Sequence, residues 1–356
     1  MEQQNPKEIF GRRLEQARRM RGLSLRGLSQ AAGDKVSYNA IHRYERGEMM
    51  PSDDVLIALA DALDKPLDFF FRPFTVAITG VQFRKKSRMG SKTTGAIEGM
   101  AADFFERYLE IEQTLGLPLK FQDPIAGSSL RKAEDAERAA ETVRSAWKLG
   151  SDPVPNVTEA LESNGIKVFE VEAPERLDGF SGWVDGHPVI ILAAWLNRDL
   201  PRKRFTALHE ASHLLIHAHA KVQGKELESC CHRFAGAILI PRDVFNKEWG
   251  GHRHRISFEE LIGLKIRYGM SIAAIMHRAL DLDLIDSATY KRFVISYKRN
   301  GWHREEPGKY CCPEKSTRFE QLVLRATVED IISISKGAAL LGKPLDQFQD
   351  RISGFA

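Results

Sequence analysis

The chain has 356 residues, of which 43% are hydrophobic and 28% are charged, a composition typical of a globular protein with roughly two or three domains. Its formal net charge of +4 is too small for the whole surface to bind a polyanion, so nucleic-acid binding would need a local patch. The longest apolar run covers residues 189–196. This run is far shorter than the roughly 18 residues that span a bilayer, so we expect no membrane segment.

Residues 7–73 form a block of short amphipathic helices separated by glycine turns. Ser24 and Ser37 are each placed to cap a helix, and a further helix is predicted over residues 53–63. Two short helices joined by a tight turn that contains glycine are typical of a DNA-binding helix-turn-helix. A small helical interaction module that does not touch DNA is the alternative.

The amino-acid sequence of this block resembles the Cro/lambda-repressor (XRE) family, at residues 18–24, 41–47, 51–52 and 60–63. The resemblance implies that the helix after the turn enters the major groove of a double-stranded DNA operator. It implies base contacts by Ser37, Tyr38, Asn39 and His42, with Arg43 on the same side. Residues 1–46 hold ten Lys/Arg against five Asp/Glu, which would favour phosphate contacts. A homodimer is expected, because such proteins usually read paired half-sites.

Residues 74–130 are predicted to link the two halves of the chain. Residues 76–83 alternate weakly like a strand, and residues 84–92 contain five basic residues in nine. The basic stretch fits either a solvated linker or an extra contact with the nucleic-acid backbone. A long amphipathic helix is expected over residues 94–115.

Residues 131–295 are predicted to form a second domain that mixes helices with a small sheet. Helices are expected over 133–148 and 157–163, followed by a strand over 166–171. Residues 180–192 read as a β-hairpin that turns at Asp185-Gly186. Such a hairpin can hold a peptide as an added strand, or it can be purely structural.

Residues 205–217 read as one helix that contains His-Glu-x-x-His. Positions four apart share a helix face, so His209 and His213 can bind a single metal, with Glu210 beside it as general base. A tetrahedral zinc needs a third protein ligand, and a second helix over 226–240 can supply a carboxylate. The cations Arg198, Arg202, Lys203 and Arg204 precede the first helix and could pair with Asp199 or solvate the helix N-terminus. Because cations there oppose the helix dipole, a role facing substrate or a partner is the alternative.

These two helices resemble the ImmA/IrrE-type metallopeptidases, in which the His-Glu-x-x-His helix is followed by a Glu and an aromatic-Ala run that ends in Pro. The resemblance implies that Glu228, six residues before Phe234, is the third ligand, with Glu226 as the fallback. His232 replaces the Asn that is usual in the family. His217, four residues after His213, is the nearest candidate for oxyanion or outer-shell support, although a surface histidine fits equally well.

Two neighbouring cysteine pairs, Cys230-Cys231 and Cys311-Cys312, are a poor layout for disulfides. With no signal-peptide character over residues 1–6, this layout predicts a cytoplasmic protein. The helices of residues 296–356 fit an extended ImmA/IrrE-type chain.

The fold class is therefore predicted to be mainly α with a small β-sheet (α+β). It combines an all-helical helix-turn-helix domain with a zincin-like metallopeptidase domain. The resemblance implies a Zn²⁺-dependent endopeptidase that regulates transcription by cleaving a partner repressor in stress or mobile-element control. The alternative is a non-proteolytic regulator or antitoxin whose peptidase-like domain senses a ligand or partner.

Overall fold

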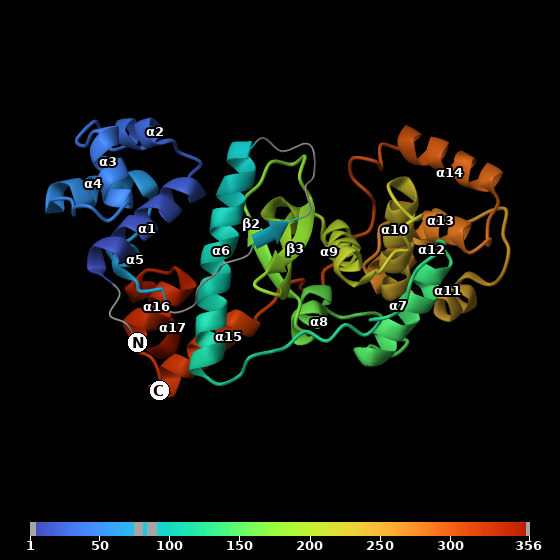
Figure 1. The fold of residues 1–356 in the computed structure, drawn as a ribbon. Helices are drawn as coiled ribbons and strands as arrows, with labels where there is room; N and C mark the ends of the chain where they lie inside the picture. The colour runs from blue at the N-terminus through green and yellow to red at the C-terminus, as the bar shows by residue number, and fades with distance from the viewer. Residues whose placement is uncertain (1–4, 75–80, 84–90, 354–356) are drawn as a thin grey trace. The chain divides into compact units, whose positions relative to one another are not determined.

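The computed structural model describes residues 5–74, 81–83 and 91–353 (Figure 1). The chain divides into two compact units, residues 1–118 together with 317–356, and residues 119–316. The expected fold class, mainly α with a small β-sheet, is confirmed. The finer boundaries at residues 73, 130 and 295 stay a prediction, and the basic stretch at residues 84–90 lies outside the described residues.

The first unit is helical. Its elements are α1 (Pro6–Met20), α2 (Leu25–Ala31), α3 (Tyr38–Glu45), α4 (Asp53–Leu63), α5 (Leu67–Phe71), the short strand β1 (Val81–Phe83), α6 (Ser91–Thr114), α15 (Arg318–Val328), α16 (Ile334–Leu341) and α17 (Leu345–Ser353). Ser24 and Ser37 cap α2 and α3 as predicted, since each side chain accepts a hydrogen bond from a backbone N–H in the first turn of its helix.

Two apolar clusters stabilise this unit. Phe10, Leu14 and Ile41 belong to the cluster that joins α1 to α5, and Tyr108 and Val323 belong to the one that packs α6 against α15, α16 and α17. A buried ion pair connects α1 to α6, because Arg13 Nη1 lies 2.7 Å from Glu106 Oε2 and the Arg13 side chain has no exposed surface. Helix α1 is therefore fixed to α6 by a buried ion pair.

The second unit contains the sheet and the remaining helices. Its elements are α7 (Asp135–Ala146), α8 (Val157–Ser163), β2 (Lys167–Val171), β3 (Gly179–Val184), β4 (His187–Ala193), the 3₁₀ turn η1 (Ala194–Arg198), α9 (Leu200–Leu215), α10 (Lys225–Leu239), α11 (Arg242–Trp249), α12 (Phe258–Tyr268), α13 (Ile272–Asp281) and α14 (Ser287–Arg299). One continuous apolar core joins the sheet to α7–α13 and includes Leu208, Phe234 and Ile238.

The predicted hairpin is present. β3 pairs antiparallel with β4, and β4 pairs on its other side with β2 in parallel. Asp185 and Gly186 both have positive φ, 47° and 78°, as a two-residue type I′ turn requires. Both β3 and β4 pack on α9, so the hairpin lies directly beside the helix that carries His-Glu-x-x-His.

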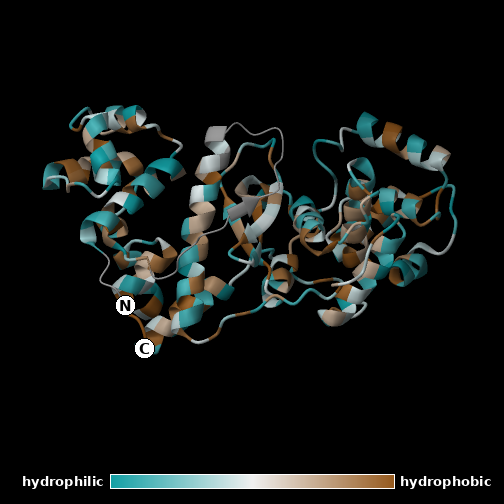
Figure 2. Cartoon of the chain, viewed as in Figure 1, coloured by the Kyte–Doolittle hydropathy of each residue, from teal (hydrophilic) through white to brown (hydrophobic). Residues whose placement is uncertain are grey.

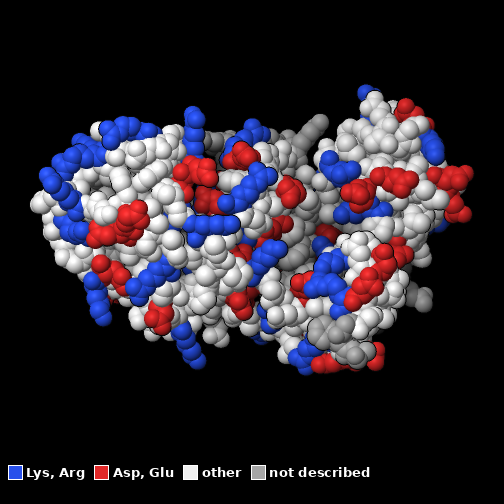
Figure 3. All heavy atoms as spheres, turned by 180° about the vertical axis from the view of Figure 1, so that it is seen from behind, with Lys and Arg blue, Asp and Glu red and all other residues white. Residues whose placement is uncertain are grey.

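The surface is mixed in charge. Basic and acidic side chains are interspersed on the face drawn in Figure 3, and hydrophobic and hydrophilic residues alternate along the helices of both units in Figure 2. Among the described residues, no helix combines the length and apolar character that crossing a membrane requires.

Candidate metal centre and DNA-reading helix

Helix α9 presents the two histidines. It begins at Leu200 because the Asp199 side chain accepts a hydrogen bond from the Arg202 backbone N–H, with Pro201 in the first turn. Ala207, Leu208, Ala211 and Leu215 bury the apolar face. The opposite stripe therefore carries the two imidazoles at the four-residue spacing that the sequence predicts.

Helix α10 brings a carboxylate to these imidazoles. Glu228 Oε2 lies 3.3 Å from His209 Nε2, and Glu228 Oε1 lies 3.7 Å from His213 Nε2. Two ligands bonded to a tetrahedral zinc at about 2.0–2.2 Å lie about 3.3–3.6 Å apart. One ligand atom from each residue lies within 4.8 Å of the others, so the three side chains fit a small divalent ion. The exposed Glu226 is not part of this cluster.

The cluster is exposed to solvent mainly at Glu228. The His213 side chain is 4% exposed and the His209 side chain 12%, whereas that of Glu228 is 50% exposed. An open position beside three protein ligands distinguishes catalytic zinc sites from structural ones.

The side chain of Glu210, on α9, contacts strand β3. Its side chain is buried, and Ser181 Oγ on β3 donates a hydrogen bond of 3.0 Å to Glu210 Oε2. The predicted general base therefore has a fixed rotamer. Its neighbour in the sequence, His209, supplies one ligand of the cluster.

Helix α3 of the first unit carries the residues predicted to read DNA. Ser37, Tyr38, Asn39, His42 and Arg43 are all exposed, although Ser37 also caps the helix through the Ala40 N–H. The basic charge is smaller than the sequence suggests. Arg13 is buried, and Arg18 Nη2 lies 2.8 Å from Glu45 Oε2 with only 14% of its side chain exposed.

Residues 161–280 match a family described as IrrE N-terminal-like domain, and residues 14–70 match a family described as Helix-turn-helix. The chain joins an IrrE-like peptidase domain to an XRE-type helix-turn-helix. Neither the curated proteins nor the solved structures gave a match. The first match contains His209, His213 and Glu228, and the second contains all of α3. The IrrE-like family is typically metal-dependent, in agreement with the ligand cluster.

The start of α9 corrects one expectation from the sequence. Lys203 and Arg204 do not face a substrate or partner, because both are completely buried within the IrrE-like unit. Lys203 Nζ binds Glu170 Oε1 at 2.7 Å, and Arg204 Nη1 binds Glu314 Oε2 at 2.6 Å. Glu314 also accepts hydrogen bonds from the Thr158 N–H and hydroxyl, so it anchors α9 to α8.

His217 lies outside the helix on which the sequence placed it, since α9 ends at Leu215. Its Nε2 is 2.6 Å from Asp123 Oδ2, and the Leu130 N–H donates to its backbone carbonyl. The residue therefore belongs to a bridge between Leu130 and Ala218 rather than to the stripe of His209 and His213. A role of His217 at the oxyanion stays a prediction.

His232 lies against the cluster without being part of it. The centroid of its ring is 4.6 Å from that of the His209 ring. The His232 ring also stacks on the Phe205 ring, with 5.8 Å between their centroids. Burial lowers the pKa of His232, and the neighbouring His209 lowers it further. The His232 ring therefore packs beside both His209 and Phe205.

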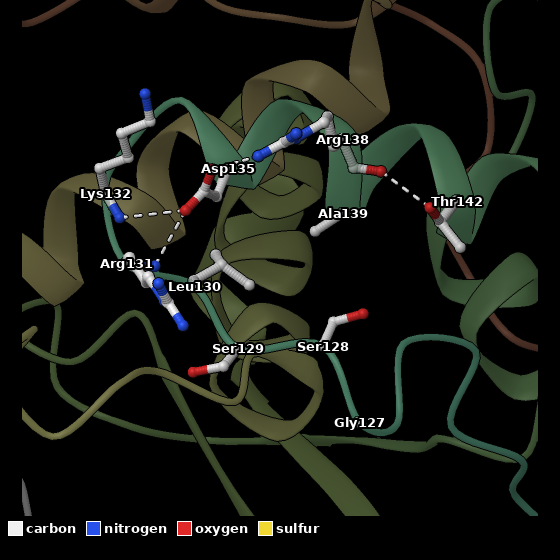
Figure 4. A pocket seen from close by; sticks show the side chains of 10 residues that line it. All are labelled: Gly127, Ser128, Ser129, Leu130, Arg131, Lys132, Asp135, Arg138, Ala139 and Thr142. Carbon is white, nitrogen blue, oxygen red and sulfur yellow. Dashed lines mark hydrogen bonds and ion pairs between the residues drawn. The ribbon is translucent and has the colours of Figure 1, made fainter.

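A separate cavity of about 710 Å³ lies between residues 127–132 and α7 (Figure 4). Asp135 accepts hydrogen bonds from the backbone N–H groups of Arg131 and Lys132 and from the Arg138 guanidinium. The Arg131 N–H bond contributes most to a lowered pKa of Asp135. None of the three clustered metal ligands lines this cavity, so it lies outside the ligand set.

Sequence reasoning missed four residues that contact predicted site residues or the helix that carries them: Ser181, Asp123, Cys231 and Glu314. Ser181 lies in the predicted hairpin, but alternation alone does not tell which face meets α9. Asp123 and Glu314 are 94 and 110 residues from their partners His217 and Arg204, so no local pattern signals them. Cys231 follows Glu228 by three residues on α10. It is buried, and its sulfur also lies 3.2 Å from His213 Nδ1.

Proposed function

We propose that the chain is a DNA-binding, zinc-dependent endopeptidase of the cytoplasm that cleaves a repressor protein and so regulates transcription. The observation that carries the proposal is that one ligand atom each of His209, His213 and Glu228 lies within 4.8 Å of the others, beside a buried Glu210. Two imidazole nitrogens and one carboxylate oxygen are a ligand set that suits zinc. The exposure of Glu228 leaves room for a peptide.

The residues of the site divide the chemistry among them. Bound zinc would supply a Lewis acid that polarises a peptide carbonyl and lowers the pKa of water. Glu210, oriented by Ser181, would take the proton from the attacking water and return it to the leaving amine. Because Ser181 fixes the carboxylate, little rotamer freedom is lost when the substrate arrives.

The helix-turn-helix supports the choice of substrate. Asn39 and Arg43 are exposed on α3, and such side chains recognise adenine and guanine edges in the major groove. A peptidase carried on a DNA-reading domain is concentrated near other DNA-bound proteins. A repressor at the same operator is therefore the substrate class that we propose, under a stress or mobile-element signal.

The experiment compares cells that express the wild-type chain with cells that express Glu210→Gln. Sequencing of new protein N-termini should find a cleavage in a repressor with the wild type alone, while chromatin occupancy is the same for both. Glu210→Gln keeps the side-chain volume and all three metal ligands. A loss of cleavage in this variant would therefore show that the reaction needs the proton transfer by Glu210.

If both chains occupy DNA and regulate transcription equally, and no N-terminus differs between them, the peptidase proposal fails. The non-proteolytic regulator would then account for both domains.

A further inference from the structure

The sulfur of Cys231 lies at the back of one metal-binding imidazole. Cys231 is on α10, has no exposed surface, and its Sγ is 3.2 Å from His213 Nδ1. We infer that Cys231 is a positioning residue of the metal centre, whose thiol accepts the His213 Nδ1–H and fixes the ring for metal binding. This inference rests on the metal site of the proposed function.

The direction of the hydrogen bond follows from the geometry. His213 turns Nε2 toward Glu228, at 3.7 Å from Oε1, so Nε2 is the nitrogen available to a metal. A neutral imidazole that gives one nitrogen to a metal carries its proton on the other. The Nδ1–H of His213 therefore points at sulfur, where metal-binding histidines usually have a carboxylate, carbonyl or water.

Helix α10 explains why the sulfur is in place. Glu228 and Cys231 are three residues apart, so they share one face of the helix and meet α9 together. A single helix thus delivers a ligand and the acceptor that orients another ligand. Movement of α10 relative to α9 would disturb both contacts at once.

Cys230 provides a matched control within the same sequence. It is also completely buried on α10, but it points about 100° away around the helix and packs in the apolar core. Burial raises the pKa of the Cys230 thiol, so this group stays an uncharged core residue. Replacing Cys230 by Ala removes the same atoms as Cys231→Ala without touching His213.

The experiment measures the affinity of the full chain for Zn²⁺ by competition with a chromophoric chelator. The variants are Cys231→Ala, Cys231→Ser and Cys230→Ala. Loss of an outer-shell partner typically weakens metal affinity about 10–100-fold, which is the effect expected for Cys231→Ala. Cys231→Ser keeps a hydrogen-bond acceptor, so its zinc affinity should stay within a few-fold of that of the wild type. The zinc affinity of Cys230→Ala should equal that of the wild type.

Thermal unfolding of each apo-protein separates lost orientation from lost folding. If Cys231→Ala is unfolded, ¹⁵N NMR of the wild type still decides, because the metal-loaded His213 must show the Nδ1–H tautomer. Equal zinc affinity of Cys231→Ala and wild type, or the opposite tautomer, overturns the inference alone. A wild type that binds no zinc overturns the proposed function as well, so the two failures are distinguishable.

Discussion

Glu314 is predicted to contribute more to the stability of the IrrE-like unit than any surface charge, because it neutralises a completely buried Arg204. Both side chains of this pair are 0% exposed, with 2.6 Å between Arg204 Nη1 and Glu314 Oε2. Removing one partner of a buried ion pair typically costs about 3–5 kcal/mol, since the remaining charge loses its compensation. Arg204 would keep carbonyl acceptors, including Val154 O at 2.6 Å, whereas the Thr158 N–H would lose its acceptor.

We therefore expect Glu314→Ala to lower the free energy of unfolding of this unit by about 3–5 kcal/mol. For a unit of this size, that loss corresponds to a fall in Tm of about 6–20 °C. Urea unfolding and calorimetry of the full chain measure both quantities. Zinc affinity should fall too, because Glu314 anchors the start of α9.

Glu175→Ala in the same unit is the control. Its ion pair with Arg198 is 3.8 Å long and about 80% exposed on both sides, so its loss should change stability by less than about 0.5 kcal/mol. If Glu314→Ala is as stable as Glu175→Ala, the reasoning about the buried anchor of α9 is refuted.

Three further predictions concern the base, the pH dependence and the DNA-reading helix. Ser181→Ala should lower turnover about 10-fold with unchanged zinc content, because one hydrogen bond to the Glu210 carboxylate is lost. The Asp281 hydrogen bond raises the pKa of His277, so this interaction stabilises the fold below pH 6.5 and its contribution disappears as pH rises through the folded pKa. Asp281→Asn should therefore reduce stability more at pH 5.5 than at pH 8.5, as urea titrations at the two pH values would show. Asn39→Ala should weaken specific DNA binding by about 1–3 kcal/mol in an equilibrium titration at fixed salt, with little effect on non-specific DNA.

Each of these predictions has a contrary result. Full turnover by Ser181→Ala would mean that the hydrogen bond from β3 does not orient the base. If the stability lost in Asp281→Asn grows as the pH rises, the predicted sign of the pH dependence of the His277–Asp281 contact is wrong. An equal loss of specific and non-specific DNA binding by Asn39→Ala would exclude base recognition by α3.

Local sequence patterns were enough to predict many, but not all, of the helices and strands; α5 and α11, for example, were not predicted. The caps Ser24 and Ser37, the turn at Asp185-Gly186 and the four-residue histidine spacing each depend on neighbours within one turn or hairpin. These features appear where they were expected, within a few residues. The family pattern also singled out Glu228, a residue that helical periodicity alone could not separate from Glu226.

The supporting contacts could not be predicted, because they join residues that are distant in the sequence. Charge patterning assigned Arg204 to the surface, since nothing nearby signals that Glu314 would neutralise it inside the core. The sequence also extended the helix two residues too far, to His217, whereas α9 ends at Leu215 and the chain then turns to pair with Leu130. Burial and long-range pairing, rather than helix propensity, decided both outcomes.

The most direct test of the account is zinc analysis of the full chain, purified without chelator, beside His213→Ala and Glu228→Ala. We expect about one zinc per wild-type chain, with affinity reduced by orders of magnitude in both variants while their helix content is unchanged. Wild-type protein without stoichiometric metal, or variants that bind zinc as tightly as the wild type, would contradict the convergence of α9 and α10 on one ion.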